Sequence, residues 1–167
     1  ATLAGLSVYL VGILSRHFTS NRLSIVLASL ATMTVPVLQV IFGFYSMNAI
    51  EVFFVLLLVR LSFFMKEKPV HWLSVGVVIG LGVMNKHTYI VYVFAIMIPY
   101  IWFQWKSIYR NQFFYLGVVV AILFVSPNLH WQYQNELPSL EFYKNAYLMK
   151  NIDLSLFQII FDQILSM

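Results

Sequence analysis

An apolar run from Trp72 to Phe103 is broken near its middle by the polar stretch Asn-Lys-His-Thr-Tyr at residues 85–89. A membrane-spanning helix needs about 20 apolar residues, so this run is too long for one crossing and too short for two. A lysine facing lipid at mid-bilayer would cost about 2.5 to 3.5 kcal/mol. The pattern therefore predicts two short helices that meet at residues 85–87, inside or just under the membrane surface. Gly76, Gly80 and Gly82 on the first helix would let a neighbouring helix pack closely.

The composition indicates a protein whose main solvent is lipid. Of the 167 residues, 61% are hydrophobic and 10% are charged, whereas soluble domains carry about 25% charged residues. The fold class predicted is an all-α polytopic transmembrane helix bundle, with membrane lipids as partners. The basic residues lie mostly between apolar runs, where membrane topology explains them, so we expect no nucleic acid partner. The absence of cysteine excludes zinc-cysteine sites.

Other apolar runs complete the predicted bundle, giving about six membrane-spanning or half-spanning helices. We interpret residues 1–167 as part of one transmembrane domain cut from a longer protein, because both ends lie inside apolar segments. Pro36 predicts a kink within the run at 23–45, and Pro127 is expected to end the run at 112–126. A tight turn is expected at 46–49, an extracytoplasmic loop at about 128–155, and a further helix from about 156 to 167. The runs are residues 1–14, 23–45, 50–65 and 112–126.

Counting crossings alternately separates the charges between the two sides of the membrane. Lys86, Lys144 and Lys150 fall on one side, and the positive-inside rule makes the other side cytoplasmic. Residues 48–51, the turn at Lys86 and the loop after Pro127 are therefore all expected at the extracytoplasmic face. This convergence is the main indication of a functional site. The basic residues assigned to the cytoplasmic side are Arg16, Arg22, Lys66, Lys68, Lys106 and Arg110.

Lys86 and Glu51 each allow two interpretations. Lys86 is either a lysine that reaches up to the lipid headgroups or a cation that pairs with the phosphate of a lipid-linked substrate. In the second case His87, Thr88 and Tyr89 could donate further hydrogen bonds. Glu51 either favours the start of its helix through the helix dipole, or faces the site as a metal ligand, a hydroxyl binder or the partner of Lys86. Asn48 shares its helix face.

The segment 126–138 combines amides, aromatic rings, one imidazole and one carboxylate. Such groups suit a sugar, although Trp131 and Tyr133 alone are typical of the aromatic belt at any membrane surface. A surface helix is expected at 140–147. No nucleophile with its base, glycine-rich phosphate loop or metal-binding motif is present. The candidate cavity residues from these segments are His130, Gln134, Glu136 and Glu141.

In order and content, several motifs resemble bacterial members of the dolichyl-phosphate-mannose protein mannosyltransferase-like family, which are GT-C membrane glycosyltransferases. The resemblance covers nearly the whole chain. The motifs are residues 45–51 (Tyr-Ser-Met-Asn-Ala-Ile-Glu), residues 76–88 with Gly76, Gly80, Gly82 and Asn85-Lys86-His87-Thr88, residues 126–142 with Ser126-Pro127-Asn128-Leu129, Trp131-Gln132, Gln134 and Pro138-Ser139-Leu140-Glu141-Phe142, and residues 151–155 (Asn-Ile-Asp-Leu-Ser).

The resemblance implies an inverting glycosyltransferase in the bacterial inner membrane, with its active site facing the periplasm or cell exterior. It implies a polyprenyl-phosphate-linked sugar as donor and a lipid or protein as acceptor. Lys86 matches the lysine that faces the carrier phosphate, and His87 would bind the same phosphate. Asn48, Glu51 and Tyr89 would line the cavity. The catalytic base would lie upstream of Ala1. Some relatives bind a divalent metal, which makes one a candidate cofactor, but no ligand is assigned here.

Two alternatives remain open from the residues themselves. The chain could belong to a transporter or permease subunit in which Lys86 and Glu51 form a gating or substrate pair, although no internal repeat is evident. It could also belong to a flippase or ligase that acts on lipid-linked saccharides. Acidic residues in a loop after an upstream first helix would favour the transferase, whereas a second half resembling this one would favour the transporter.

Overall fold

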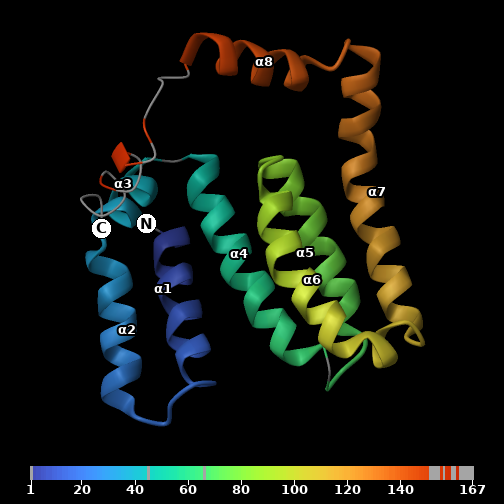
Figure 1. Cartoon of the computed structure of the whole chain (residues 1–167). Coiled ribbons are helices and arrows are strands. Elements are labelled where there is room, and N and C mark those ends of the chain that lie inside the picture. The colour runs from blue at the N-terminus through green and yellow to red at the C-terminus, as the bar shows by residue number, and fades with distance from the viewer. Residues whose placement is uncertain are drawn as a thin grey trace. The chain divides into compact units, whose positions relative to one another are not determined.

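The computed structural model describes residues 2–44, 46–65 and 67–150, together with residues 155, 157, 158 and 161. Every regular element in these residues is an α-helix, which confirms the all-α prediction (Figure 1). The helices are α1 (Thr2–Ser15), α2 (Arg22–Thr34), α3 (Pro36–Gly43), α4 (Met47–Phe64), α5 (His71–Asn85), α6 (Tyr89–Ile108), α7 (Gln112–Gln134) and α8 (Pro138–Lys150).

The chain divides into two compact units, Ala1–Val125 and Ser126–Met167. The first contains α1 to α6 and most of α7, and the second contains the end of α7 and α8. In the first unit the connections α1–α2, α4–α5 and α6–α7 lie at one end, and the connections α3–α4 and α5–α6 lie at the other (Figure 1). The α3–α4 end therefore carries Asn48, Glu51 and Lys86, as the alternating count predicts for the extracytoplasmic face.

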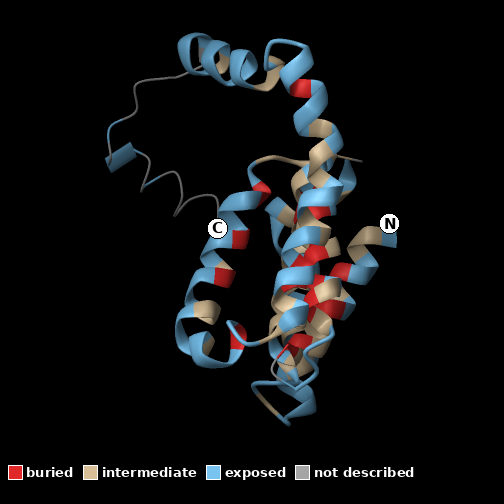
Figure 2. Cartoon of the chain, turned by 90° about the vertical axis from the view of Figure 1, so that its right-hand side faces the viewer, coloured by how far each residue is buried: buried red, intermediate tan, exposed pale blue. Residues whose placement is uncertain are grey.

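The core of the first unit lies where α4, α5 and α6 pack together (Figure 2). Leu58 of α4, Val75 of α5 and Tyr89 of α6 are almost completely buried. The ring of Trp72 packs edge-on against Phe114 at the start of α7, with ring centroids 4.8 Å apart. By contrast, the outer face of α6 exposes Trp102 and Phe103 by 80% and 82%. Large exposed apolar side chains of this kind suit a lipid environment.

Glycines let α5 approach its neighbours closely. A Cβ on Gly76 would overlap the carbonyl oxygen of Gly117 on α7, and a Cβ on Gly80 would lie 2.5 Å from the Cβ of Phe124. Gly82 is in contact with the ring of Tyr89 on α6. The prediction that these three glycines permit close packing is confirmed, and small residues at helix contacts are a common device in membranes.

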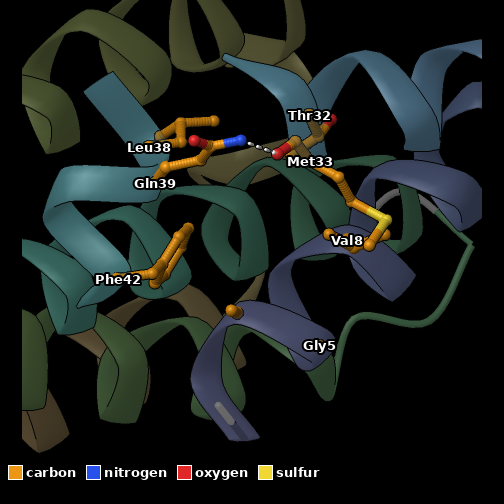
Figure 3. A pocket seen from close by; sticks show the side chains of 8 residues that line it. Gly5, Val8, Thr32, Met33, Leu38, Gln39 and Phe42 are labelled. Carbon is orange, nitrogen blue, oxygen red and sulfur yellow. Dashed lines mark hydrogen bonds between the residues drawn. The ribbon is translucent and has the colours of Figure 1, made fainter. Parts of the chain in front are cut away.

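The predicted kink at Pro36 is confirmed as a bend of 61° between α2 and α3. Proline cannot continue the hydrogen bonds of α2, so carbonyl groups at the end of that helix lose their helical partners. The side-chain amide of Gln39 donates a hydrogen bond of 3.0 Å to the carbonyl of Met33 (Figure 3). A pocket of about 380 Å³ lies beside the bend, between α1, α2 and α3.

Two described helices, α4 and α7, are long and apolar enough to cross a membrane, and the bent pair α2 and α3 is a third candidate. The helices α1 and α5 are apolar but shorter. The break expected at residues 85–87 is confirmed, because residues 86–88 separate α5 from α6. Helix α5 has 15 residues, whereas α6 has 20 and continues past Phe103 to Ile108, so the second helix is not the short one that was expected. The total of about six spanning or half-spanning helices stays a prediction.

Two local predictions were wrong. Residues 46–49 do not form a separate turn, because α4 begins at Met47 and includes Asn48 in its first turn. Pro127 does not end its helix: it lies inside α7, which continues to Gln134. Prolines are tolerated in long apolar helices when other groups satisfy the freed backbone. In the described part of the stretch expected as an extracytoplasmic loop, residues 128–150, the end of α7 is followed by α8. The position of this stretch outside the membrane stays a prediction.

Some sequence-based expectations lie outside the described residues. They include the roles of Tyr45 and Lys66, the motif residues 151–154, and most of the further helix expected at 156–167. The surface helix expected at 140–147 is observed within α8, and its Glu141 is the acidic residue of the first turn.

Candidate functional site

The candidate site forms where the first turns of α4 meet the break between α5 and α6, residues 86–88. Helix α5 ends at Asn85 because the backbone of Lys86 is extended, with φ −157° and ψ 123°. The chain then turns and α6 begins at Tyr89. Because α4 and α5 run in opposite directions, the start of α4 and the end of α5 lie at the same end of the unit (Figure 1).

Lys86 forms an ion pair across this junction. Its Nζ lies 2.9 Å from Oε2 of Glu51 and donates a second hydrogen bond of 2.8 Å to Oδ1 of Asn48. The lysine side chain is 30% exposed, whereas that of Glu51 is only 8% exposed. The lysine therefore extends from a buried carboxylate toward the surface of the unit.

Further hydrogen bonds complete the junction. Thr88 donates from Oγ1 to Oε1 of Glu51 at 3.0 Å, so both carboxylate oxygens of Glu51 accept a hydrogen bond. Asn85 donates from Nδ2 to the carbonyl of Met47 at 2.8 Å. We call the side chains of Asn48, Glu51, Asn85, Lys86 and Thr88 the Lys86 cluster.

Tyr89 supports this cluster from below. Its side chain is fully buried, and its hydroxyl donates a hydrogen bond of 3.0 Å to the carbonyl of Phe54, two turns into α4. Residues 47, 51 and 54 lie on one face of α4 because helical residues three and four apart are neighbours. The contacts therefore run from the polar cluster down into the apolar core, and Tyr89 lies in that core.

The electrostatics of the cluster keep Lys86 paired with Glu51 and leave the Lys86 ammonium able to bind an anion. Removing either partner of a buried ion pair costs about 3 to 5 kcal/mol, because the other charge is left unpaired. An ammonium group has three N–H donors. Lys86 can therefore hold both Asn48 and Glu51 and donate to one additional oxyanion from its exposed side.

The structure brings together four of the side chains that the sequence singled out, namely Asn48, Glu51, Lys86 and Thr88. Of the two interpretations of Glu51, the observed contact is with Lys86. His87 lies in the break beside Lys86 and is partly buried. The roles of Asn85 and Thr88 as partners of α4 were not foreseen, because their contacts join residues more than 35 positions apart.

In the second unit, His130, Gln134 and Glu136 are exposed around the end of α7, and Glu141 is exposed in the first turn of α8. The residue that organises this corner is Gln132, which is 7% exposed. Its Nε2 donates to Oγ of Ser139, and its Oε1 accepts a hydrogen bond of 3.2 Å from the backbone N–H of Ser139. The expectation that His130, Gln134, Glu136 and Glu141 share a site with Lys86 stays a prediction.

The corner itself has an unusual backbone. Glu136 and Leu137 adopt positive φ angles of 62° and 57°, a conformation that costs non-glycine residues about 1 to 2 kcal/mol each. The N–H of Leu137 bonds the carbonyl of Gln132 at 2.8 Å, which is the hydrogen bond of a Schellman helix end. The turn after α7 is therefore held by both backbone and side-chain contacts.

The described residues do not fit a metal site. No three histidine, aspartate or glutamate side chains gather in the part of the chain that the structure describes. Both oxygens of Glu51 are engaged by Lys86 and Thr88.

The fold and the site define a polytopic helical membrane protein with a lysine–carboxylate pair at one end of its bundle. The family model described as dolichyl-phosphate-mannose-protein mannosyltransferase matches residues 1–131, so the chain belongs to this family. No curated protein and no solved structure matches it significantly. The protein is accordingly a membrane glycosyltransferase of the mannosyltransferase type, and this membership favours the transferase over the transporter.

Proposed function

We propose that this protein transfers a sugar from a polyprenyl-phosphate donor to a lipid or protein acceptor at the extracytoplasmic face of the bacterial inner membrane. The observation that carries the proposal is the position of the Lys86 ammonium. It is held by Asn48 and Glu51 yet remains partly exposed at one end of the bundle. A phosphate at the membrane surface could reach it while the polyprenyl chain stays in lipid.

The reaction needs a cation at this place. When the bond between the anomeric carbon and the phosphate oxygen breaks, its electron pair goes to that oxygen, and negative charge grows on the phosphate. A fixed positive charge that meets this growing charge lowers the barrier, because it interacts more strongly with the transition state than with the donor. Lys86 would supply that charge, and His87 could add a hydrogen bond.

The acceptor side needs a base that removes a proton from the attacking hydroxyl or amine. Glu51 suits this role poorly, because it is buried and both of its oxygens already accept hydrogen bonds. We propose that another carboxylate of the whole protein serves as this base. We propose that attack from the face opposite the phosphate inverts the anomeric configuration, and that His130, Gln134, Glu136 and Glu141 contact the sugar or the acceptor.

The proposal is tested by replacing Lys86 in the whole protein. With a polyprenyl-phosphate-linked sugar as donor, Lys86→Ala should lower turnover by about a hundredfold or more, as removal of a charge-stabilising donor does in other enzymes. Lys86→Arg keeps the charge but not the geometry, so it should retain part of the activity. The measurement is the initial rate of sugar transfer by purified, reconstituted protein.

Lys106→Ala is the matched control. Lys106 is an exposed lysine in the last turn of α6, at the end of the unit away from Lys86. Its removal changes the net charge equally but should leave transfer unaltered. If Lys86→Ala protein folds and transfers sugar at the rate of the unsubstituted protein, the proposed role of Lys86 is refuted.

A further inference from the structure

We infer that Glu51 sets the charge selectivity of the phosphate site, so that the site favours a phosphodiester over a phosphomonoester. The inference rests on the proposed function and deepens it. In that reaction the donor is a phosphodiester and the spent carrier is a phosphomonoester. Glu51 would therefore help the enzyme to release its product, and it would act as a specificity-determining residue without touching the reacting atoms.

The first observation is the charge balance of the site. Within residues 46–56 and 82–92, Lys86 and Glu51 are the two residues with fully charged side chains at neutral pH, and His87 is the neighbouring titratable imidazole. The two charges lie 2.9 Å apart, so the Lys86 cluster carries no net charge. A site built only to bind phosphate tightly would not place a carboxylate against its single lysine.

The second observation is the burial of the carboxylate. Glu51 is 8% exposed at its side chain, and Thr88 holds its second oxygen in place. When an anion binds, the Glu51 carboxylate can turn toward water only by breaking its hydrogen bonds to Lys86 and Thr88. Buried charges are also screened much less by salt than exposed ones. The negative charge of Glu51 therefore acts on any phosphate that contacts Lys86.

The chemistry of transfer changes the charge of the ligand. The donor phosphate is esterified to both the sugar and the polyprenol, and it carries one negative charge. Transfer breaks the bond to the sugar, leaves its electron pair on the phosphate oxygen, and passes the acceptor proton to the base. The resulting phosphomonoester carries about 1.5 to 2 negative charges at neutral pH.

The carboxylate repels this additional charge. Lys86 touches the phosphate directly and attracts both ligands, while Glu51 lies just behind it at a distance of a few ångströms. At such separations a unit charge changes affinity by about tenfold or more when the effective dielectric constant is about 20, the value typical of pairs near a protein surface. The spent carrier should therefore bind less tightly, relative to the donor, than it would at a lysine with no carboxylate behind it.

The test compares two sugar-free probes as inhibitors of the whole reconstituted protein. One is polyprenyl phosphate, a monoester, and the other is its methyl ester, a diester with one charge. The quantity measured is the inhibition constant of the monoester divided by that of the diester. In Glu51→Gln, which keeps the shape and one of the two hydrogen-bond acceptor oxygens, we expect this ratio to fall about tenfold. Progress curves should also show stronger inhibition by product.

Asn48→Asp provides the opposite change. Asn48 already accepts a hydrogen bond from Lys86 through Oδ1, so aspartate adds one negative charge at nearly the same position. The ratio should rise in this variant and stay unchanged in Lys106→Ala. If Glu51→Gln does not fold, Asn48→Asp decides: a raised ratio supports the inference and an unchanged ratio overturns it.

Failure of this inference is distinguishable from failure of the proposed function. If the unsubstituted protein transfers sugar and Glu51→Gln weakens both probes by the same factor, Glu51 only positions Lys86 and the charge selectivity is refuted. If neither probe inhibits, or if Lys86→Ala leaves both inhibition constants unaltered, the phosphate site itself is elsewhere and both proposals are overturned.

Discussion

The ring of Tyr89 occupies the space that a side chain on Gly82 would need. A Cβ built on Gly82 would lie 2.8 Å from Cζ of Tyr89 and closer still to Cε1 and Cδ1. Gly82 is in the last turn of α5 and Tyr89 is the first residue of α6. Because Gly82 has no side chain, the ring of Tyr89 can pack beneath residues 86–88, the break that contains Lys86.

Gly82→Ala should consequently destabilise the protein. The new methyl group would push the buried ring of Tyr89 and its hydrogen bond to Phe54, and overpacking of this kind costs about 1 to 3 kcal/mol. Thermal unfolding of the purified protein in detergent measures the effect. Gly5→Ala is the control, because a Cβ there meets nothing within 4 Å and alanine favours the helix. Equal melting temperatures for Gly82→Ala and the unsubstituted protein would contradict the prediction.

The corner between α7 and α8 provides a second prediction. Gln132→Leu removes both side-chain bonds to Ser139, and each such bond contributes about 1 kcal/mol. The start of α8 should then open more often, so the backbone amide of Ser139 should exchange with deuterium about thirtyfold faster. Gln134→Leu removes an exposed amide from the same turn and should change little. Unaltered exchange at Ser139 in Gln132→Leu would show that the backbone turn alone holds the corner.

Hydrophobic periodicity and proline positions predict most of the helices. The runs around Pro36 and around residues 85–89 predicted breaks, and the structure has both, because an apolar backbone must form helices and can interrupt them only at such points. Pro127 shows the limit of this reasoning. Pro36 stands at the bend between α2 and α3, whereas Pro127 is accommodated within α7, and the difference depends on whether other groups satisfy the freed backbone.

The candidate site was predicted in part. Alternating crossings place Lys86 at the same end as Asn48 and Glu51, so their proximity follows from topology. The exact pairing does not, because it depends on how α4 and α5 are rotated about their axes. Thr88 illustrates this point: its hydroxyl could donate to a substrate or to Glu51, and only the packed structure assigns it to Glu51.

The sidedness of the membrane gives the third prediction. One end of the first unit carries Arg16, Arg22 and Lys106, whereas the other end carries Lys86, whose charge Glu51 balances. The positive-inside rule then places the basic end in the cytoplasm. Residues 1–167 contain no cysteine, so single cysteines introduced here can report each end once any cysteine elsewhere in the whole protein has been replaced. Met47→Cys should react with a membrane-impermeant maleimide in intact spheroplasts.

Ser20→Cys and Ser107→Cys should react only after the membrane is permeabilised. All three positions are exposed in the structure, so a difference in labelling reflects the side of the membrane and not burial. Labelling with a permeant maleimide confirms that each cysteine is reactive. The reverse pattern would put the Lys86 cluster in the cytoplasm. A donor phosphate presented at the outer surface could not then reach Lys86, because moving that charge through the bilayer is prohibitive.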